Sequence, residues 1–469
     1  MSTKKLGFWI LTALVVGNMV GTGIFMLPGS LRSVASPLGV VSAWLVTGFG
    51  VLILALVFGN LSLRKPHLTG GPQLYAKELF KSGSKMATLS GFMSTWGYWI
   101  GSLIGNIAVI TSFAGYLSTF FPILLSQAEL FTMGGFTLKV GNTLTFIVCT
   151  VLLWGVHFIV LQGANSAGKI NFIATAAKVV SFFLFIVIGL FAFEKANIMP
   201  FVAPTVDKLG QSVGLLGQVN SAAVITLWAF IGVESAVVFG SRAKRQIDVK
   251  RATVLGLFIA LAIYIGISTL VMGLLPHEQL IVSEKPLIDA FSTVTGPIGG
   301  QILAAIGLVS FFGSTIGWIM LSAEVPYQAA KQGMFMPQFL KTNKNGMPVF
   351  SMIVTNAVGQ LFIFSTISSS ISAAFQFMIV VATLSYLVPY LISSLFQLKL
   401  VITGDTYADG KGRISDGVIA VFALLYSIWV IYAGTADLKT FSMGVVLLLS
   451  SLLFYKWVKP VALVKENEV

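Results

Sequence analysis

The stretch Gly17-Asn18-Met19-Val20-Gly21-Thr22-Gly23-Ile24-Phe25 interrupts the first apolar run of the chain. That run extends from about Leu6 to Leu27, and ~20 residues suffice for a helix that spans a bilayer. Each of the three glycines in the stretch costs a helix about 1 kcal/mol relative to alanine. Broken backbone at membrane depth is tolerated where it lines a cavity or binds a ligand, and its free N–H and C=O groups suit the two charges of an amino acid. A glycine-rich helix-packing face is the alternative.

The composition is that of a polytopic membrane protein. Of the 469 residues, 56% are hydrophobic and 10% are charged, whereas soluble domains carry roughly 25% charged residues. The single cysteine excludes an intrachain disulfide bond. Three histidines and one cysteine do not supply the ligands of a usual zinc site, and no phosphate-binding loop or nucleophile triad is present. We therefore expect no enzyme, no metal and no cofactor.

Hydropathy predicts twelve spans, at roughly 7–29, 38–63, 87–113, 142–161, 168–193, 212–238, 253–275, 297–325, 348–367, 373–398, 415–434 and 440–457. The N-terminus, the even-numbered loops and the C-terminus hold 22 lysines and arginines, against 6 in the odd-numbered loops. By the positive-inside rule this multi-pass protein of the cell membrane has both termini in the cytoplasm. The net charge of +13 is therefore a topology signal, and we expect no nucleic-acid partner.

Three predicted spans carry polar groups that are costly in lipid. Span three places Tyr98, Ser102 and Asn106 at helical spacing, and the Asn106 amide needs a partner from a ligand or from another helix. Lys178 lies near the middle of span five, where a charge costs ~3 kcal/mol or more unless it is paired or functional. Glu234 lies in the middle of span six, two residues after Gly232, a glycine that interrupts this span as the glycines of 17–25 interrupt span one. Burial favours the protonated form of Glu234. A structural pairing of Glu234 with Lys178 is the alternative to a functional role.

The two interrupted spans, one and six, are five spans apart. This spacing suggests two inverted repeats of five helices, with the substrate site where the broken helices face each other. Residues 1–238 then hold repeat one (helices 1–5, about 7–193) and broken helix 6, and residues 239–398 hold helices 7–10, which complete repeat two. Residues 399–469 hold peripheral helices 11–12 and a cytoplasmic tail, and we expect a scaffold or a homodimer surface there.

Several motifs resemble the amino acid–polyamine–organocation (APC) superfamily. They are the stretch 17–25, Gly70-Gly71-Pro72-Gln73-Leu74-Tyr75-Ala76 and Phe230-Ile231-Gly232-Val233-Glu234-Ser235-Ala236. Within it the chain is most similar to the basic amino acid/polyamine antiporters, such as the arginine/agmatine exchanger. The specific matches are Trp228 with 232–235, 104–108 and 343–349. The resemblance covers nearly the whole chain, and it implies an all-α leucine-transporter-type fold of twelve helices with a 5+5 inverted repeat and broken helices 1 and 6.

The resemblance also implies which residues bind the substrate. Thr22 and Gly23 would bind the α-carboxylate, and the backbone carbonyls of Met19, Trp228 and Ile231 would hold the α-ammonium. Gly21, in the first break, is also counted among the substrate-binding residues. The pocket for the distal side chain would be formed by Gly101, Ser102, Asn106, Trp318 and Ala382. Trp228 would be the middle gate, and the inner gate would consist of Tyr98, Glu234 and Tyr390.

Two departures bear on the substrate. Ala382 stands where the arginine/agmatine exchanger has a serine, and Lys178 resembles a lysine that other members place where sodium-coupled relatives hold a sodium ion. We therefore expect sodium-independent secondary transport by alternating access, with exchange of cationic amino acids (arginine, lysine, ornithine) or their amines. A neutral amino acid permease or proton symporter is the alternative within transport. A channel or amino-acid sensor is the alternative from another class, although no span has a continuous polar stripe and no soluble output domain is present.

Overall fold

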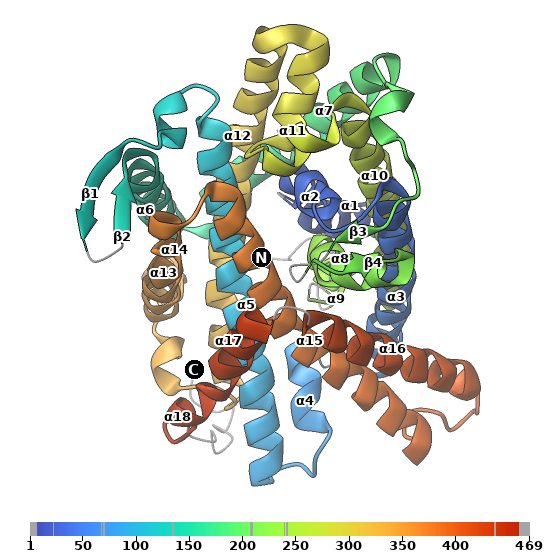
Figure 1. Cartoon of the computed structure of the whole chain (residues 1–469). Coiled ribbons are helices and arrows are strands. Elements are labelled where there is room, and N and C mark those ends of the chain that lie inside the picture. Colours follow the sequence, from blue (N-terminus) through green and yellow to red (C-terminus); the bar gives the residue numbers. More distant parts are fainter. Residues whose placement is uncertain are drawn as a thin grey trace.

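The computed structural model is almost entirely helical (Figure 1). It describes residues 7–458 except 22, 67, 69, 70, 134, 135, 207–209, 239, 241, 242, 436 and 437. The α-helices are α1 (Phe8–Met19), α2 (Gly23–Arg32), α3 (Pro37–Arg64), α4 (Tyr75–Glu78), α5 (Lys85–Leu117), α6 (Val140–Leu161), α7 (Ala164–Phe191), α8 (Leu215–Ala229), α9 (Ser235–Val238), α10 (Gln246–Leu274), α11 (His277–Val282), α12 (Pro286–Lys331), α13 (Val349–Ile363), α14 (Ser365–Ser368), α15 (Ile371–Thr403), α16 (Arg413–Gly434), α17 (Leu438–Leu449) and α18 (Ser451–Tyr455). Short 3-10 helices are η1 (Pro72–Leu74), η2 (Pro122–Leu125), η3 (Lys195–Ile198) and η5 (Pro337–Leu340).

Helices occupy each of the ranges that hydropathy predicts as spans. Among the described residues, nine helices are long and apolar enough to cross a bilayer, and the bent pair α1–α2 makes a tenth. The apolar parts of α7 and α8, Val180–Phe191 and Leu215–Ala229, are shorter. The polytopic helical fold is thus confirmed, while the number of twelve spans and the inverted repeat stay predictions.

Two features depart from the predicted pattern. Two antiparallel hairpins lie between helices: β1 (Glu129–Met133) pairs with β2 (Phe136–Lys139), and β3 (Thr205–Val206) pairs with β4 (Ser212–Val213). In addition, α12 begins eleven residues before the predicted span at 297, with non-helical backbone at Gly296 (φ 72°) just before a proline. Positive φ is readily adopted by glycine, and proline is favoured at the first position of a helix, so the span itself starts there.

Both predicted interruptions are present. The first span is bent by 45° between the end of α1 and the start of α2. In the sixth, α8 ends at Ala229 and α9 begins only at Ser235. Gly232 in this second break has φ of +106°, a conformation that side chains other than glycine rarely adopt. The glycines that made these stretches unusual in the sequence therefore coincide with real breaks in the backbone.

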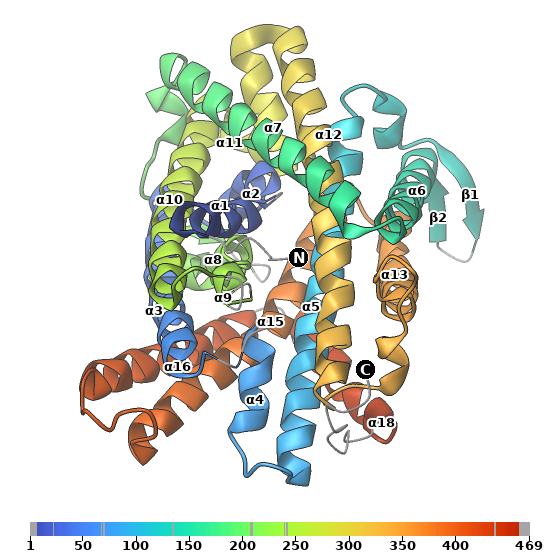
Figure 2. The ribbon, with the colours of Figure 1, turned by 180° about the vertical axis from the view of Figure 1, so that it is seen from behind.

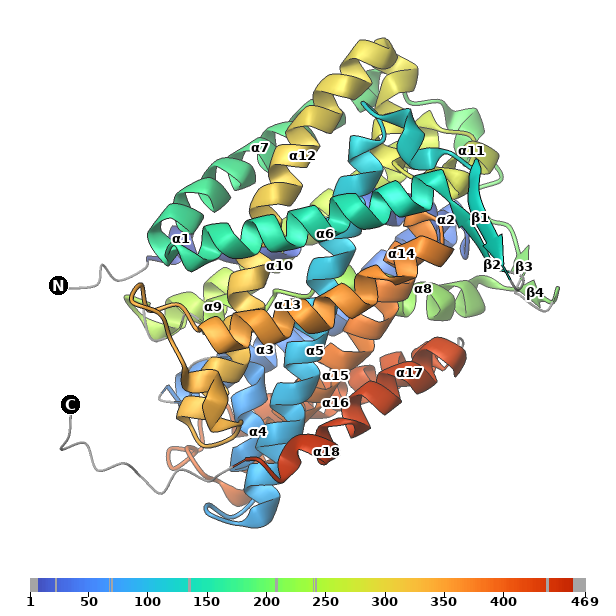
Figure 3. The same cartoon turned by 90° about the vertical axis from the view of Figure 1, so that its left-hand side faces the viewer.

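The long helices form two groups that meet along the broken spans (Figure 1, Figure 2). In the first, which we call the broken-helix group, α10 packs along α1 and α3, α3 packs along α8, and α2 packs against α8 and α10. In the second, the α5 group, α5 packs along α12 and α15, and α7 packs along α12. In the same group α6 lies beside α13 (Figure 3).

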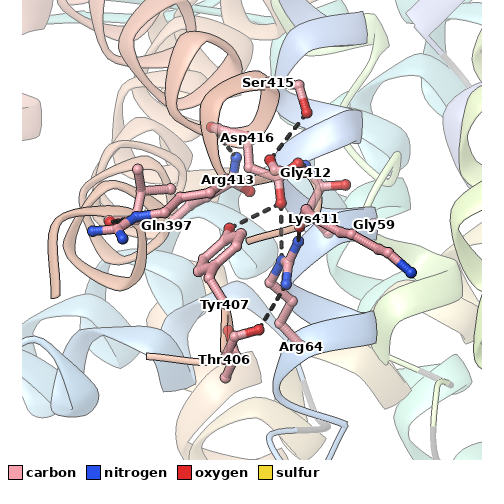
Figure 4. A network of polar contacts seen from close by, with 12 residues as sticks. Gly59, Arg64, Gln397, Thr406, Tyr407, Lys411, Gly412, Arg413, Ser415 and Asp416 are labelled. Carbon is pink, nitrogen blue, oxygen red and sulfur yellow. Dashed lines mark hydrogen bonds and ion pairs between the residues drawn. The ribbon is translucent and has the colours of Figure 1, made fainter. Parts of the chain in front are cut away.

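The peripheral helix α16 is fastened to the broken-helix group by a polar network around Asp416 (Figure 4). The Asp416 carboxylate accepts hydrogen bonds from Arg64 Nε at 2.9 Å, from Asn60 Nδ2 at 2.9 Å and from the Tyr407 hydroxyl at 2.8 Å. Lys250 of α10 donates to Asn60 Oδ1 at 2.6 Å. Helix α16 also contacts the α5 group, because Gln397 of α15 donates to the Asp416 carbonyl at 2.7 Å. The other peripheral helix, α17, attaches to α5, because Trp96 donates to the Leu447 carbonyl at 2.9 Å.

Candidate substrate site

Two tryptophans face each other where the two groups meet. Trp228, next to the C-terminus of α8, and Trp318 of α12 have ring centroids 6.4 Å apart and planes inclined by 17°. The Trp228 indole also lies against α2 and α5. A Cβ at Gly23 of α2 would be 3.3 Å from the indole, and a Cβ at Gly105 of α5 would be 2.8 Å from it. Because neither glycine has a side chain, the indole fills the space between α2 and α5.

The predicted distal-pocket residues of α5 lie against α15. A Cβ at Gly101 would lie 2.7 Å from the ring of Tyr386 and 3.2 Å from the Ala382 carbonyl. Ser102 Oγ donates to the Tyr98 carbonyl at 2.7 Å and shares a hydrogen bond with the Tyr386 hydroxyl at 2.8 Å. The structure thus brings Gly101, Ser102 and Ala382 together, and it adds Tyr386, which already engages the serine hydroxyl.

Asn106 is the polar residue of this region with an unused acceptor. The residue is 3% exposed, and its Oδ1 atom has no hydrogen-bond donor among the described residues. Leaving a buried acceptor unsatisfied costs about 1–3 kcal/mol. Its chain neighbour Gly105 borders both tryptophan rings, with a Cβ there 3.7 Å from Trp318. A guanidinium or ammonium group, which only donates hydrogen bonds, suits this oxygen.

Backbone groups at the first break are partly used within the chain. The Met19 carbonyl, assigned by resemblance to the substrate ammonium, accepts the Gly21 N–H at 2.6 Å. Thr22 lies outside the described residues. Gly23 begins α2, and the first N–H groups of a helix have no partner within the helix. These groups and the positive end of the helix dipole favour a carboxylate at this position.

The second break is tied to the first. The Trp228 carbonyl accepts the Ile231 N–H at 3.1 Å, so both residues take part in the turn that ends α8. Across the gap, the Asn18 amide donates to Ser235 Oγ at 2.7 Å. The two breaks therefore lie side by side, as a site between two broken helices requires.

Glu234 holds together the three residues that the resemblance assigns to the inner gate. The Tyr98 hydroxyl donates to Oε1 at 2.8 Å, and the Tyr390 hydroxyl donates to Oε2 at 2.8 Å. The N–H of Gly232 donates to Oε2 at 3.1 Å. With the residue 2% exposed, this carboxylate joins α5, α15 and the second break through three hydrogen bonds.

Lys178 reaches the first broken span from the opposite group. Its Nζ atom is 3.3 Å from the Gly17 carbonyl of α1, and 3.3 Å from Ser314 Oγ of α12. The residue is 5% exposed. Since Glu234 has its own donors, the structural ion pair between the two groups is not formed among the described residues. The ammonium instead donates to backbone beside the first break.

Sequence reasoning missed Tyr386, Ser314 and the Asn18–Ser235 bond, of which the first two lie one helical turn from a residue that it singled out. Tyr386 precedes Tyr390 by four residues, and Ser314 precedes Trp318 by four, so each pair is one helical turn apart. That spacing was a usable signal. The Asn18–Ser235 bond had none, because it links two breaks that are far apart in the sequence.

This arrangement is suited to binding and release rather than to chemistry. Among the residues that the structure describes, no group of three histidine, cysteine, aspartate or glutamate side chains is placed to hold a metal ion. A sequence model described as amino acid permease matches residues 6–455. The chain belongs to this family. An amino acid permease is a membrane transporter and not an enzyme, as the sequence predicts.

Relatives of this amino acid permease align over most of their length. A protein of Bacillus subtilis (strain 168), named putative arginine/ornithine antiporter, is 53% identical over 457 residues, which are 97% of each chain. The arginine/ornithine antiporter of Pseudomonas aeruginosa is 38% identical over 442 residues, 92% of this chain and 87% of the relative. The arginine/agmatine antiporter of Chlamydia pneumoniae is 35% identical over 463 residues, 97% and 90% respectively. The resemblance to antiporters of basic amino acids is thereby confirmed.

Proposed function

We propose that this permease exchanges arginine for ornithine, or for another cationic amino acid or amine, across the cell membrane by alternating access. The observation that carries the substrate class is the buried Oδ1 of Asn106, which has no donor among the described residues and follows Gly105, the residue of α5 that borders both tryptophan rings. A cationic side chain supplies the missing donor, and its charge is favoured over the face of an indole such as that of Trp318. The names of the relatives point to the same substrates.

In this proposal the breaks bind the part that all amino acids share. The α-carboxylate binds at the N-terminus of α2, around Gly21, Thr22 and Gly23. The α-ammonium binds at the carbonyls of Met19, Trp228 and Ile231. Two of these carbonyls already accept one N–H within the breaks, and the second lone pair of each oxygen is left for the ammonium.

Two gates flank this position. The Trp228 indole fills the space between α2 and α5, so it must swing away to admit substrate and can then cover it. On the other side, the bonds from Tyr98 and Tyr390 to Glu234 close the path toward the cytoplasm. Protonation of Glu234 weakens the acceptor of both bonds, which makes this gate sensitive to pH.

Lys178 replaces a coupling sodium ion in this proposal. A sodium ion is held by backbone carbonyls and hydroxyls, and the lysine ammonium contacts one of each, at Gly17 and Ser314. The ammonium supplies a positive charge at the break without a bound ion, and we propose that transport needs no sodium. The proposed topology keeps both termini in the cytoplasm, with twelve spans in a 5+5 repeat, and a homodimer through helices 11–12.

Uptake of radiolabelled arginine into proteoliposomes tests this function. Vesicles preloaded with ornithine should accumulate label rapidly in sodium-free buffer, whereas empty vesicles and vesicles preloaded with alanine should not. Saturable uptake of neutral amino acids alone would replace the proposal by a neutral permease, and flux without a counter-substrate would favour a symporter or a channel.

Asn106→Ala tests the residue that sets the substrate class. We expect arginine affinity to fall about tenfold or more, because a charged hydrogen bond contributes ~1.5–3 kcal/mol, with little change for alanine. Asn356→Ala is the matched control: Asn356 is 1% exposed but bonds His157 between α13 and α6. An equal loss for every amino acid would remove Asn106 from the distal pocket.

A further inference from the structure

Four aromatic rings from four helices form a closed cluster. Phe25 of α2 has its ring centroid 5.4 Å from that of Tyr116 in α5, 4.8 Å from that of Phe182 in α7 and 4.9 Å from that of Phe311 in α12. Tyr116 and Phe311 are 4.8 Å apart. All four residues are at most 4% exposed. We call them the Phe25 cluster.

The cluster lies at the opposite end of the proposed path from Glu234. Along α5, Tyr98 precedes Asn106 by eight residues and Tyr116 follows it by ten, which at 1.5 Å per residue is ~12 Å and ~15 Å. Along α12, Phe311 precedes Trp318 by seven residues, or ~10 Å. The tryptophan pair is therefore enclosed between the Glu234 bonds on one side and the Phe25 cluster on the other.

The contacts of the cluster cross between the two helix groups. Phe25 belongs to the broken-helix group, whereas the other three rings belong to the α5 group. All three ring contacts of Phe25 must therefore break when the groups separate at this end. Phe25 also follows Gly23 by two residues on α2, so a displacement of this helix moves the ring and the proposed carboxylate position together.

Two buried hydroxyls make the closed cluster less stable than its rings suggest. Neither the Tyr116 hydroxyl nor the Ser310 hydroxyl has a hydrogen-bond partner among the described residues, although both atoms are buried. The Tyr116 ring rests on Gly307, where a Cβ would lie 2.7 Å from it. Ser310 follows Gly307 by three residues and so shares that face of α12. The contacts of Tyr116 with Gly307 and Phe311 lie within the α5 group, so water reaches the two hydroxyls from the side that Phe25 leaves when the groups separate.

We propose that the Phe25 cluster is the outer gate of the transport path, closed by ring contacts and kept able to open by the two unpaired hydroxyls. The assignment of the path rests on the proposed function, but the gate itself does not depend on which amino acid is carried. Closing three aromatic contacts favours the occluded form, and hydrating two buried hydroxyls favours the open one. These two opposing contributions keep the occluded and open forms close in free energy.

A cysteine at position 310 reports the opening of this gate. In the full-length chain with Cys149→Ser, Ser310→Cys is exposed in intact cells to a membrane-impermeant, cationic thiol reagent, and its rate of modification is measured. We expect Phe25→Ala to raise that rate about tenfold, and Phe25→Leu to raise it less. Tyr116→Phe should lower it several-fold, because the closed form then no longer buries an unpaired hydroxyl.

Phe339→Ala is the matched control. Phe339 is 2% exposed and also contacts three rings, those of Trp99, Phe335 and Phe350, but all of these lie on the α5 side. It should leave the labelling rate unchanged. Three results would overturn the assignment of the Phe25 cluster as the outer gate. Phe25→Ala could label at the same rate as its parent, Phe339→Ala could raise the rate as much as Phe25→Ala, or labelling could occur only from the cytoplasmic side. None of these results depends on arginine exchange, so failure of the proposed substrate is separately visible.

Discussion

Replacing Lys178 by alanine removes the one cation that contacts the first break among the described residues. Its ammonium donates to the Gly17 carbonyl and to the Ser314 hydroxyl, both at 3.3 Å. Hydrogen bonds to a charged group contribute about 1.5–3 kcal/mol each, and these long distances favour the lower end. Together the two contacts amount to ~3 kcal/mol, or about two factors of ten. We expect the rate of exchange to fall roughly 100-fold, because the first break is then less stable in the conformation that binds substrate.

The assay is arginine/ornithine exchange in proteoliposomes, in buffer whose sodium is replaced by choline. Lys399→Ala is the control, because Lys399 likewise donates to two carbonyls, those of Glu78 at 2.7 Å and Leu79 at 3.1 Å, outside the site. We expect the control to retain most of its exchange rate, and wild-type exchange to be the same with and without sodium.

Two results would refute the reasoning. A strict sodium requirement in the wild type would show that the ammonium does not replace a metal ion. If Lys178→Ala exchanges as fast as the Lys399→Ala control, the two contacts of Lys178 do not stabilise the first break in its transporting conformation. Protein abundance in the membrane is measured for both variants, so that loss of folding is not mistaken for loss of transport.

Four further outcomes follow from the site and the peripheral network. Gly23→Val should abolish arginine binding in an inserted protein, since a Cβ there is already 3.3 Å from the Trp228 indole; wild-type affinity would contradict the carboxylate position. Trp228→Leu should exchange at least tenfold more slowly while binding weakens little, because occlusion is a conformational step; an unchanged rate argues against a gate. Glu234→Gln should flatten the pH dependence of exchange with binding preserved, and an unchanged profile would leave Glu234 a structural acceptor. Asp416→Ala should lower the free energy of unfolding by ~3 kcal/mol, as three donors lose one buried carboxylate, measured as a lower melting temperature in detergent.

The breaks and the costly polar groups could be predicted because lipid leaves few alternatives. A backbone without internal hydrogen bonds is expensive in a bilayer, so three glycines in mid-span at 17–25, and Gly232 beside a carboxylate at 230–236, indicated functional interruptions. The same cost singled out Lys178 and Glu234. Neither inference required knowledge of which helices are neighbours.

What the sequence could not show is how the helix faces meet. The pairing of Lys178 with Glu234 stayed open in the sequence, and only the packing of α7 between α1 and α12 gives Lys178 its partners. Phe25 and Tyr116 carried no signal, because apolar rings are ordinary in a chain that is 56% hydrophobic. The early start of α12 was missed since its first turns lie outside the apolar run.

The bonds of Asp416 make the two peripheral helices mechanically unequal. Because α16 is bonded to α3 through Arg64 and to α15 through Gln397, it links the two helix groups, whereas α17 is bonded to α5; rocking between the groups therefore strains the contacts of α16. The outer side of α16 carries large apolar side chains, including Ile414, Leu425 and Tyr432, which are 84%, 56% and 67% exposed. In the proposed alternating-access cycle, the part of this surface that faces lipid moves through acyl chains, so the viscosity of the bilayer acts as friction on turnover.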